Sequence, residues 1–459
     1  MKIALVRCPC VNLPYPPSVG LAYINSVLKK AGHEVFVFDL NIEIFHAADG
    51  QDKNKWNIPD VSGLIDLGQE ISRKHDQLFR ENLKKIAETG SGVIGFSVWD
   101  SNAALSLKIA KEIKLLSPQV KVIFGGPECF PEWGGNDLIK HDCVDLVVYG
   151  EAEETLPEVI EYLELTGRIG LHAGTIAKSN GRVVNFGSRP APPELDSLPF
   201  PDFDGFPLEK YATKEMPIIF NRGCSRKCVY CSLPGTTPAY RSRSAHSIFE
   251  EFKYQLNKYP QVDVFHCDSP ALNSNLKELS RLCELMINDG LKISWSGFAV
   301  IDKRMDAQLL EKMKKAGCAG LNFGIESGSQ KIVDKMRKGF SIEDAQNNLR
   351  DAYNLGMQTV ANFIVGFPGE NEEDFQETLD FISRNKQYIS FVGSTAACWI
   401  GPYIWIQEHP EEFAITQEQD GWSCKENNNQ VRKHRELRLK EFADSLGIGK
   451  AYPKLSDKT

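Results

Sequence analysis

The chain has 459 residues, of which 42% are hydrophobic and 25% charged, proportions typical of a globular protein with two or three domains. Its 53 basic and 61 acidic residues give a net charge of −8, which disfavours nucleic acid as a partner. No apolar run reaches the roughly 18 residues of a membrane span, and the first apolar segment is too short for a signal peptide. We therefore expect a cytoplasmic protein.

The first 165 residues alternate short apolar strands with amphipathic helices, which predicts a doubly wound parallel sheet. An acidic and polar stretch at 49–76 interrupts the alternation and predicts an inserted loop and helix. The expected strands are 2–7, 34–40, 92–98, 121–124 and 145–148, and the expected helices are 19–31, 102–115 and 154–163.

Residues 166–209 have a different composition and are expected to link two domains. A hairpin is predicted at 175–184 from its Asn180-Gly181 turn, and a proline-rich run follows it.

The alternation of strands and helices resumes over 210–400. Six strand–helix steps are too few for a closed eight-fold barrel, and they predict a partial (β/α)6 TIM barrel with its site at the carboxyl ends of the strands. Residues 401–459 are expected to form a C-terminal cap. The expected strands are 217–220, 262–266, 293–298, 320–324, 359–363 and 388–393, and four of the helices between them are expected at 247–258, 276–289, 307–316 and 342–355.

Three of the twelve cysteines lie within eight residues, directly after a predicted strand. Cys224, Cys228 and Cys231 have the spacing C-x3-C-x2-C. A structural zinc site requires four ligands, usually as paired C-x2-C units. Three thiolates on one loop can instead hold a [4Fe–4S] cubane and leave one iron open to a chelating ligand. The amino and carboxylate groups of S-adenosylmethionine (SAM) are such a ligand; a zinc knuckle or chance clustering is the alternative.

With the strand-end segments that follow it, this cysteine loop resembles the radical SAM superfamily over about residues 210–400. The resemblance implies that the cluster cleaves SAM to a 5′-deoxyadenosyl radical. Glu370 follows an ordinary Pro-Gly turn and is expected to be solvated. The SAM-binding residues that the resemblance implies are Tyr230, Asp268, Ser269, Gly324, Glu326, Ser327 and Gly366.

The N-terminal domain carries glycine-containing segments after its predicted strands, at the edge where open α/β sheets bind ligands. Because G-x-G-x-x-G is absent after the first strand, NAD and FAD are not expected. The order of these segments resembles the Rossmann-like cobalamin (B12)-binding domain that often precedes a radical SAM barrel; the alternative is a vestigial fold that lost its cofactor. The cobalamin contacts implied are Pro17, Ser18, Ser97, Gly125, Gly126, Pro127, Glu128, Tyr149, Gly150 and Glu151.

The stretch that could supply the lower ligand of cobalt departs from a common cobalamin pattern. Many cobalamin proteins carry Asp-x-His-x-x-Gly after the first strand, whereas residues 8–13 contain no histidine. His33 is expected at the surface. Cys8 and Cys10 could approach the cobalt, but buried structural roles are favoured. The resemblance therefore implies a His-off cobalamin.

Together these features favour a cobalamin-dependent radical SAM methyltransferase acting on an unactivated carbon of a small molecule or lipid precursor. A flavodoxin- or ferredoxin-type electron donor is expected. The alternatives are a radical SAM cyclase or coupling enzyme whose N-terminal domain is only scaffold, and a non-catalytic corrinoid-binding or redox-sensing module. A tRNA methylthiotransferase is disfavoured because three N-terminal cluster cysteines and a basic C-terminal module are missing. The aromatic segment 398–405 is expected either to contact substrate or to pack the cap.

Overall fold

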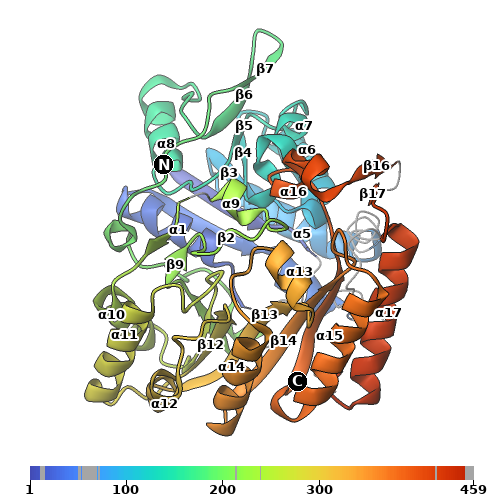
Figure 1. Cartoon of the computed structure of the whole chain (residues 1–459). Coiled ribbons are helices and arrows are strands. Elements are labelled where there is room, and N and C mark those ends of the chain that lie inside the picture. Colours follow the sequence, from blue (N-terminus) through green and yellow to red (C-terminus); the bar gives the residue numbers. More distant parts are fainter. Residues whose placement is uncertain are drawn as a thin grey trace. The chain divides into compact units, whose positions relative to one another are not determined.

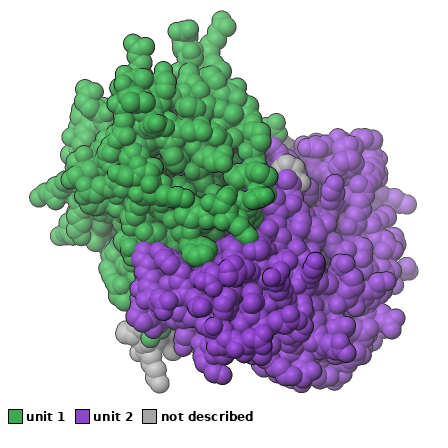
Figure 2. Space-filling view, turned by 90° about the vertical axis from the view of Figure 1, so that its left-hand side faces the viewer, with its two compact units in different colours: residues 1–217 green, residues 218–459 purple. Residues whose placement is uncertain are grey.

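The computed structural model describes residues 1–10, 16–49, 53, 70, 73–211, 214–237, 239–418 and 421–449. The chain divides into two compact units, residues 1–217 and 218–459, which are coloured green and purple in Figure 2. The insertion predicted at 49–76 lies almost entirely outside the described residues. Among the residues described, no helix is long and apolar enough to span a bilayer.

The first unit contains the predicted parallel sheet, and its strand order is β2-β1-β3-β4-β5-β6-β7 (Figure 1). The first five strands pair in parallel in the order 2-1-3-4-5, which is the flavodoxin-like order. The doubly wound sheet is therefore confirmed. The strands are β1 (Lys2–Arg7), β2 (Glu34–Asp39), β3 (Val93–Ser97), β4 (Lys121–Gly125), β5 (Leu146–Val148), β6 (Thr175–Ser179) and β7 (Arg182–Asn185).

Helices connect these strands. The central strand β1 is apolar and buried along nearly its whole length, because a parallel strand in such a sheet is covered on both faces. Helix α1 starts after Ser18, whose hydroxyl accepts the N–H of Leu21 at 3.4 Å. The helices of this unit are α1 (Val19–Lys30), α2 (Leu40–Ala47), α5 (Asp76–Glu88), α6 (Ala103–Leu116), the short α7 (Asn136–Leu138) and α8 (Thr155–Thr166).

The hairpin expected within the linker forms the antiparallel edge of this first sheet. Strand β6 pairs with β5, and β7 pairs with β6. Asn180 and Gly181 have φ values of 50° and 73°, the left-handed conformation that a tight hairpin turn requires. The segment joins the sheet because β5 would otherwise leave its backbone N–H and C=O groups unpaired.

The second unit contains a six-stranded sheet in the order β15-β14-β13-β12-β11-β8, as the predicted six strand–helix steps require. Strands β11 to β15 pair in parallel. The strands are β8 (Glu215–Ile218), which starts at the end of the first unit, β11 (Val264–Cys267), β12 (Ser294–Ala299), β13 (Cys318–Glu326), β14 (Gln358–Val365) and β15 (Phe391–Ala397).

Helices cover one face of this sheet (Figure 1). Phe265 of β11 packs edge-on against Phe252 of α10 with ring centroids 4.8 Å apart, and Phe363 of β14 packs against Phe381 of α15. The core of this unit therefore lies between the strands and these helices. The helices are α10 (Ala245–Lys258), α11 (Leu276–Asp289), α12 (Ala307–Lys315), α13 (Gln330–Lys335), α14 (Ile342–Asn354) and α15 (Glu372–Asn385).

Short elements complete the second unit. Strands β9 (Asn221–Arg222) and β10 (Arg241–Ser242) pair with each other, and α9 (Leu233–Thr236) lies between them in the sequence. After β15 come α16 (Trp405–Glu408), the pair β16 (Thr416–Glu418) and β17 (Gly421–Ser423), and the long helix α17 (Asn429–Ser445). Helix α17 packs against β15 and α15 (Figure 1).

Two ion pairs join β1 to β2 at opposite ends of the same strand pair. Lys2 lies opposite Glu34 and is exposed, with Nζ 3.9 Å from the carboxylate. Arg7 lies opposite Asp39, is buried, and has its guanidinium 3.4 Å from the carboxylate. The Tyr211 hydroxyl also donates to Asp39, at 2.8 Å. The buried pair therefore lies at the carboxyl ends of β1 and β2.

We predict that Arg7→Met destabilises the protein by about 3 to 5 kcal/mol, because it leaves the buried Asp39 carboxylate without its cation. The matched change Lys2→Met, at the exposed end of the same strand pair, is expected to cost about 0 to 1 kcal/mol. Chemical denaturation followed by circular dichroism measures both. Equal losses in the two variants would contradict this assignment.

Candidate functional site

The three clustered cysteines lie on the loop that follows β9, as partly exposed free thiols. Gly223 enters this loop with φ +71°, and a Cβ there would lie 2.8 Å from the backbone oxygen of Ala239. Only glycine fits this approach. Within the loop, the N–H of Arg226 donates to Sγ of Cys224 at 3.4 Å.

Ser269 holds the segment that enters the loop. Its buried hydroxyl accepts the backbone N–H groups of Phe220 and Asn221 at 2.8 and 3.1 Å. Ser269 follows β11, so this contact ties the cysteine loop to the end of the neighbouring strand.

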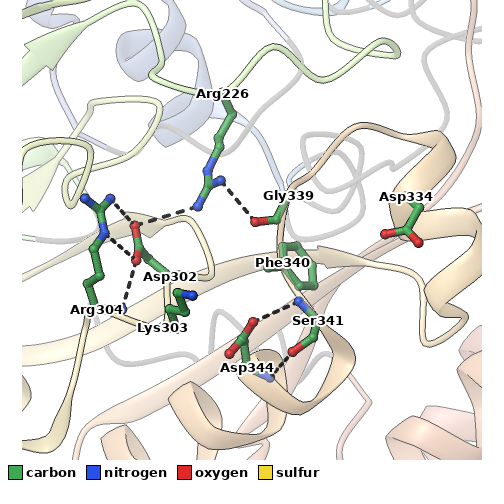
Figure 3. Close-up of a pocket in the computed structure, with 9 residues that line it drawn as sticks. All are labelled: Arg226, Asp302, Lys303, Arg304, Asp334, Gly339, Phe340, Ser341 and Asp344. Atoms are coloured by element: carbon green, nitrogen blue, oxygen red, sulfur yellow. Dashed lines mark hydrogen bonds and ion pairs between the residues drawn. The ribbon is translucent and has the colours of Figure 1, made fainter.

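Arg226 braces the loop from its other side (Figure 3). Its guanidinium donates to the carbonyls of Ile301 and Gly339 at 3.0 and 3.3 Å, and it lies 3.7 Å from the Asp302 carboxylate. It lines a cavity of about 420 Å³ whose charged side chains are of both signs. Arg226 therefore connects the cysteine loop to the segments that follow β12 and α13.

The three thiols of the loop are the donor set that a cubane cluster requires. Burial raises the pKa of the Cys228 thiol, and it raises the pKa of Cys231 to about 11, so ligation must displace their protons. Over the described residues, no three His, Cys, Asp or Glu side chains converge closely enough to hold one metal ion. The cysteines of a cubane each bind a different iron and need not converge in that way.

Tyr230, Glu326 and Lys338 form a buried network beside the cysteines. The Tyr230 hydroxyl donates to Oε1 of Glu326 at 3.1 Å, and Nζ of Lys338 donates to the same oxygen at 3.0 Å. Lys338 also donates to the carbonyl of Gly324 at 2.7 Å. Glu326 has φ +71°, which is uncommon for a residue with a side chain, and these bonds hold it there.

Lys338 was not predicted. It lies 108 residues after Tyr230, whose hydroxyl it contacts at 3.1 Å. A buried carboxylate requires a cation. Burial of Glu326 would therefore have indicated a nearby lysine or arginine. The sequence, however, offers four cations between 331 and 338 and no means to choose among them.

The other predicted SAM residues occupy different environments. Asp268 follows β11 and is exposed. Ser327 is buried, and its hydroxyl contacts Thr378 and accepts the N–H of Ser329. Gly366, with φ +71°, follows β14. The structure thus brings Tyr230, Gly324 and Glu326 together.

Glu370 is buried, and the expectation that it is solvated was wrong. Its carboxylate accepts the N–H of Gly366 at 2.5 Å and a guanidinium N–H of Arg435 at 3.1 Å. Arg435 belongs to α17, which is distant in the sequence and covers the Pro-Gly turn. The side chain of Asn427 also donates to the carbonyl of Phe367 in this turn. Burial raises the pKa of Glu370 to about 7.

The predicted cobalamin residues all lie at the carboxyl edge of the first sheet. Ser97 ends β3, Gly125 ends β4, Tyr149 follows β5, and Pro17 and Ser18 precede α1. The remaining ones, Gly126, Pro127, Glu128, Gly150 and Glu151, follow β4 and β5. This is the edge at which a flavodoxin-like sheet binds its ligand.

Two glycines at this edge have different reasons to be glycine. A Cβ on Gly126, which has φ +111°, would lie 2.7 Å from the carbonyl oxygen of Val98, so Gly126 serves packing between turns. Gly150 has φ +78° and would meet nothing within 4 Å. Its open backbone fits the approach of a large flat group such as a corrin.

Two of the predicted side chains at this edge already have roles within the protein. Ser18 caps α1, and the buried Tyr149 donates its hydroxyl to Asn185 at 2.8 Å. Burial, with a smaller effect of Asp100, raises the pKa of Glu128. Cobalamin contacts through these side chains stay predictions.

The segment after β1 begins with two buried thiols. Cys8 and Cys10 are both buried, and burial raises the pKa of Cys8 to about 12. The Arg7 guanidinium donates to Sγ of Cys10 at 3.5 Å. Residues 11–13 of this stretch lie outside the described residues.

As a whole residue His33 is half-buried, and its ring packs against the N-terminal amine. Its side chain is only 6% exposed and lies 3.2 Å from the amino group of Met1 and near Glu164. These contacts place it at the amino edge of β1 and β2, away from the predicted ligand edge, because the N-terminal amine sits there.

The chain matches two family models. Residues 218–382 match the radical SAM superfamily, and residues 60–160 match the B12 binding domain. These matches fall within the two regions that the sequence analysis assigned to those domains.

Several known proteins are similar along most of the chain. An uncharacterized methyltransferase of Pyrococcus horikoshii is 27% identical over 433 residues, which cover 90% of this chain and 83% of the relative. Cytidylyl-2-hydroxyethylphosphonate methyltransferase of Streptomyces wedmorensis is 26% identical over 429 residues, which cover 82% and 74%. The structure of the radical S-adenosylmethionine methyltransferase TsrM from Kitasatospora setae matches with a TM-score of 0.69 at 18% identity, over 90% of this chain and 76% of that one. At that identity the structural likeness concerns the fold.

We predict that Lys338→Met destabilises the second unit by about 3 to 5 kcal/mol, because Glu326 then stays buried without a cation. Adding Glu326→Gln to this variant is expected to recover part of the loss, because it removes the unpaired charge. Lys335→Met, an exposed lysine three residues earlier, serves as the control. A double-mutant cycle from denaturation midpoints measures the coupling, and additive losses would contradict it.

The raised pKa of Glu370 predicts a pH-dependent stability. Between about pH 7 and pH 4.5 the folded chain holds a proton on Glu370 that the unfolded chain releases. Stability relative to Glu370→Gln is therefore expected to rise as the pH falls through this window and to be lost again as the pH rises through 7. Melting temperatures of both proteins across this range test the sign, and parallel curves would refute it.

Proposed function

Because the chain belongs to the radical SAM superfamily and carries a B12-binding domain, we propose that it is a cobalamin-dependent methyltransferase acting on an unactivated carbon of a small molecule. Its cofactors are a [4Fe–4S] cluster, SAM and cobalamin. The observation that carries the proposal is the presence in one chain of a three-thiol loop and a 2-1-3-4-5 sheet with an open glycine at its ligand edge.

Cys224, Cys228 and Cys231 would hold the cluster and leave one iron for SAM. When bound, the cluster supplies the electron that breaks a carbon–sulfur bond of SAM, and cobalamin supplies a carrier for the methyl group. The protein positions the reactants, because Ser269 and Arg226 fix the cysteine loop at its two sides. We further assign SAM contacts to the exposed Asp268, to Gly324 and Glu326 beside Tyr230, and to the turn at Gly366.

The lower face of cobalt would meet no histidine from the start of the segment after β1. Cys8 is buried and its thiol stays protonated because burial raises its pKa, which removes it as a ready ligand. The one histidine considered for this role, His33, lies at the opposite edge. These observations support a cobalamin bound without a histidine ligand.

The substrate class is proposed as a small molecule with a carbon that lacks an acidic hydrogen. The name of the Streptomyces wedmorensis relative refers to a nucleotide-linked phosphonate, and the Kitasatospora setae enzyme was determined with tryptophan. These two molecules share little chemistry, so likeness alone does not select a substrate. A small electron-transfer protein, a flavodoxin or ferredoxin, is proposed as the donor to the cluster.

Anaerobic reconstitution with iron, sulfide and hydroxocobalamin tests the proposal. We predict that the absorbance spectrum of the wild-type protein shows both a cluster and a retained corrinoid, and that SAM and a reductant yield 5′-deoxyadenosine. Cys228→Ala is expected to lose the cluster and this product but to keep the corrinoid, because the residues proposed for the two cofactors belong to different units.

Cys143→Ala, which removes a partly exposed thiol outside the loop, is the matched control and should retain both cofactors. Failure of the wild-type protein to retain cobalamin would exclude the cobalamin-dependent reaction. A Cys228→Ala protein that keeps its cluster and still cleaves SAM would exclude the assigned cluster ligands.

A further inference from the structure

Arg432 is a buried cation whose NH1 atom finds no hydrogen-bond acceptor among the described residues. Its side chain projects from α17, the residue is 4% exposed, and its NH1 atom is buried with no hydrogen-bond partner. Across the part of the chain that the structure describes, no carboxylate lies within ion-pair distance of its guanidinium. Because buried arginines are almost always paired, this one requires an explanation.

The contacts that Arg432 does make leave its in-plane donors unused. The guanidinium lies over the ring of Trp422 at 3.8 Å, and the aliphatic stem packs on Gly366, where a Cβ would lie 2.3 Å from Cγ. A cation–π contact uses the face of the guanidinium and not its N–H groups, which point outward in the plane. Burial lowers the pKa of the Arg432 guanidinium, and the charges of Cys398, Cys424 and Glu418 oppose that effect.

Arg435, one turn further along the same helix, is a buried arginine that does have hydrogen-bond acceptors. It is equally buried, but its NH1 donates to the carboxylate of Glu370 at 3.1 Å and to Oδ1 of Asn427 at 2.8 Å. The neighbourhood thus supplies a carboxylate and an amide oxygen to NH1 of Arg435, whose Nε stays without a hydrogen bond, whereas Arg432 has only the aromatic contact with Trp422. The difference separates Arg432 from an ordinary buried ion pair.

The position of Arg432 is that of a site residue. Gly366, on which its stem packs, directly follows β14, and Cys398 directly follows β15. Both lie at the carboxyl edge of the second sheet, where barrels of this class carry out their chemistry. A largely buried guanidinium whose NH1 lacks an acceptor is suited to holding carboxylate or phosphoryl oxygens.

We propose that Arg432 is an anion-binding residue of this site, which takes the carboxylate or phosphoryl group of a small molecule through its in-plane N–H groups. The inference rests on the proposed function in one respect, because that function supplies the two candidate anions. The anion belongs either to SAM or to the substrate. In both cases the bound anion supplies the negative charge that no described carboxylate places within ion-pair distance of Arg432.

The experiment compares the full-length, reconstituted wild-type protein with Arg432→Met and with Arg438→Met. Arg438 is the control because it is on the same helix but partly exposed and paired with Glu372. Melting temperatures are measured without ligand, with inorganic phosphate and with chloride at matched ionic strength. SAM affinity is measured by isothermal titration calorimetry.

We expect Arg432→Met to raise the melting temperature of the ligand-free protein, because it removes an unpaired buried charge and keeps an apolar stem over Trp422. Phosphate should stabilise the wild-type and Arg438→Met proteins but not Arg432→Met. A melting temperature lowered by Arg432→Met, with equal phosphate responses in all three proteins, would overturn the proposal and make Arg432 a packing residue.

Two further arms keep the test decisive. If SAM affinity falls about tenfold in Arg432→Met, the anion is the SAM carboxylate; if it is unchanged while the phosphate response is lost, the anion belongs to the substrate. Arg432→Lys, which keeps the charge without the planar fork, should retain a weakened phosphate response and replaces the methionine variant if that fails to fold. A wild-type protein that does not bind SAM refutes the proposed function, whereas the phosphate comparison still tests Arg432.

Discussion

The buried ion pair between Glu326 and Lys338 is the interaction on which the arrangement of the second unit's site depends. It places a full negative and a full positive charge next to the cysteine loop, and each is tolerable only because the other is present. Tyr230 lies between the second and third cysteines and bonds to both partners, so the loop is tied to the end of β13 by charge as well as by chain connectivity. The left-handed backbone of Glu326 is maintained by the same contacts.

The sequence predicted those features that are encoded locally. The apolar runs of β1 and β11 to β15, the Asn180-Gly181 turn and the C-x3-C-x2-C spacing each signal themselves within a few residues, and the structure contains them near the expected positions. Long-range partners were not predictable in this way. Lys338, Arg435 and the burial of Glu370 follow from segments that meet only after folding.

Helix α17 belongs to the C-terminal region, which was expected to form a cap, and it contacts β15 at the edge of the second sheet. Arg435 and Asn427 hold the turn that begins at Gly366, and Arg432 lies on that glycine itself. The region therefore covers the turn that follows β14. A polar helix without a strong apolar stripe is usually predicted to lie at the surface. In α17, however, two of the buried residues are arginines.

The sequence separations in this site have a consequence for the order in which it is built during synthesis. The cysteine loop emerges from the ribosome more than a hundred residues before Lys338, and the turn at Glu370 emerges 65 residues before Arg435. Until those partners arrive, the loop lacks the charges that fix it and the turn carries an uncovered carboxylate. A cluster delivered to the nascent chain would meet an unfinished binding loop. The cysteine loop is therefore expected to reach its final geometry only after Lys338 has emerged and packed against Tyr230 and Glu326.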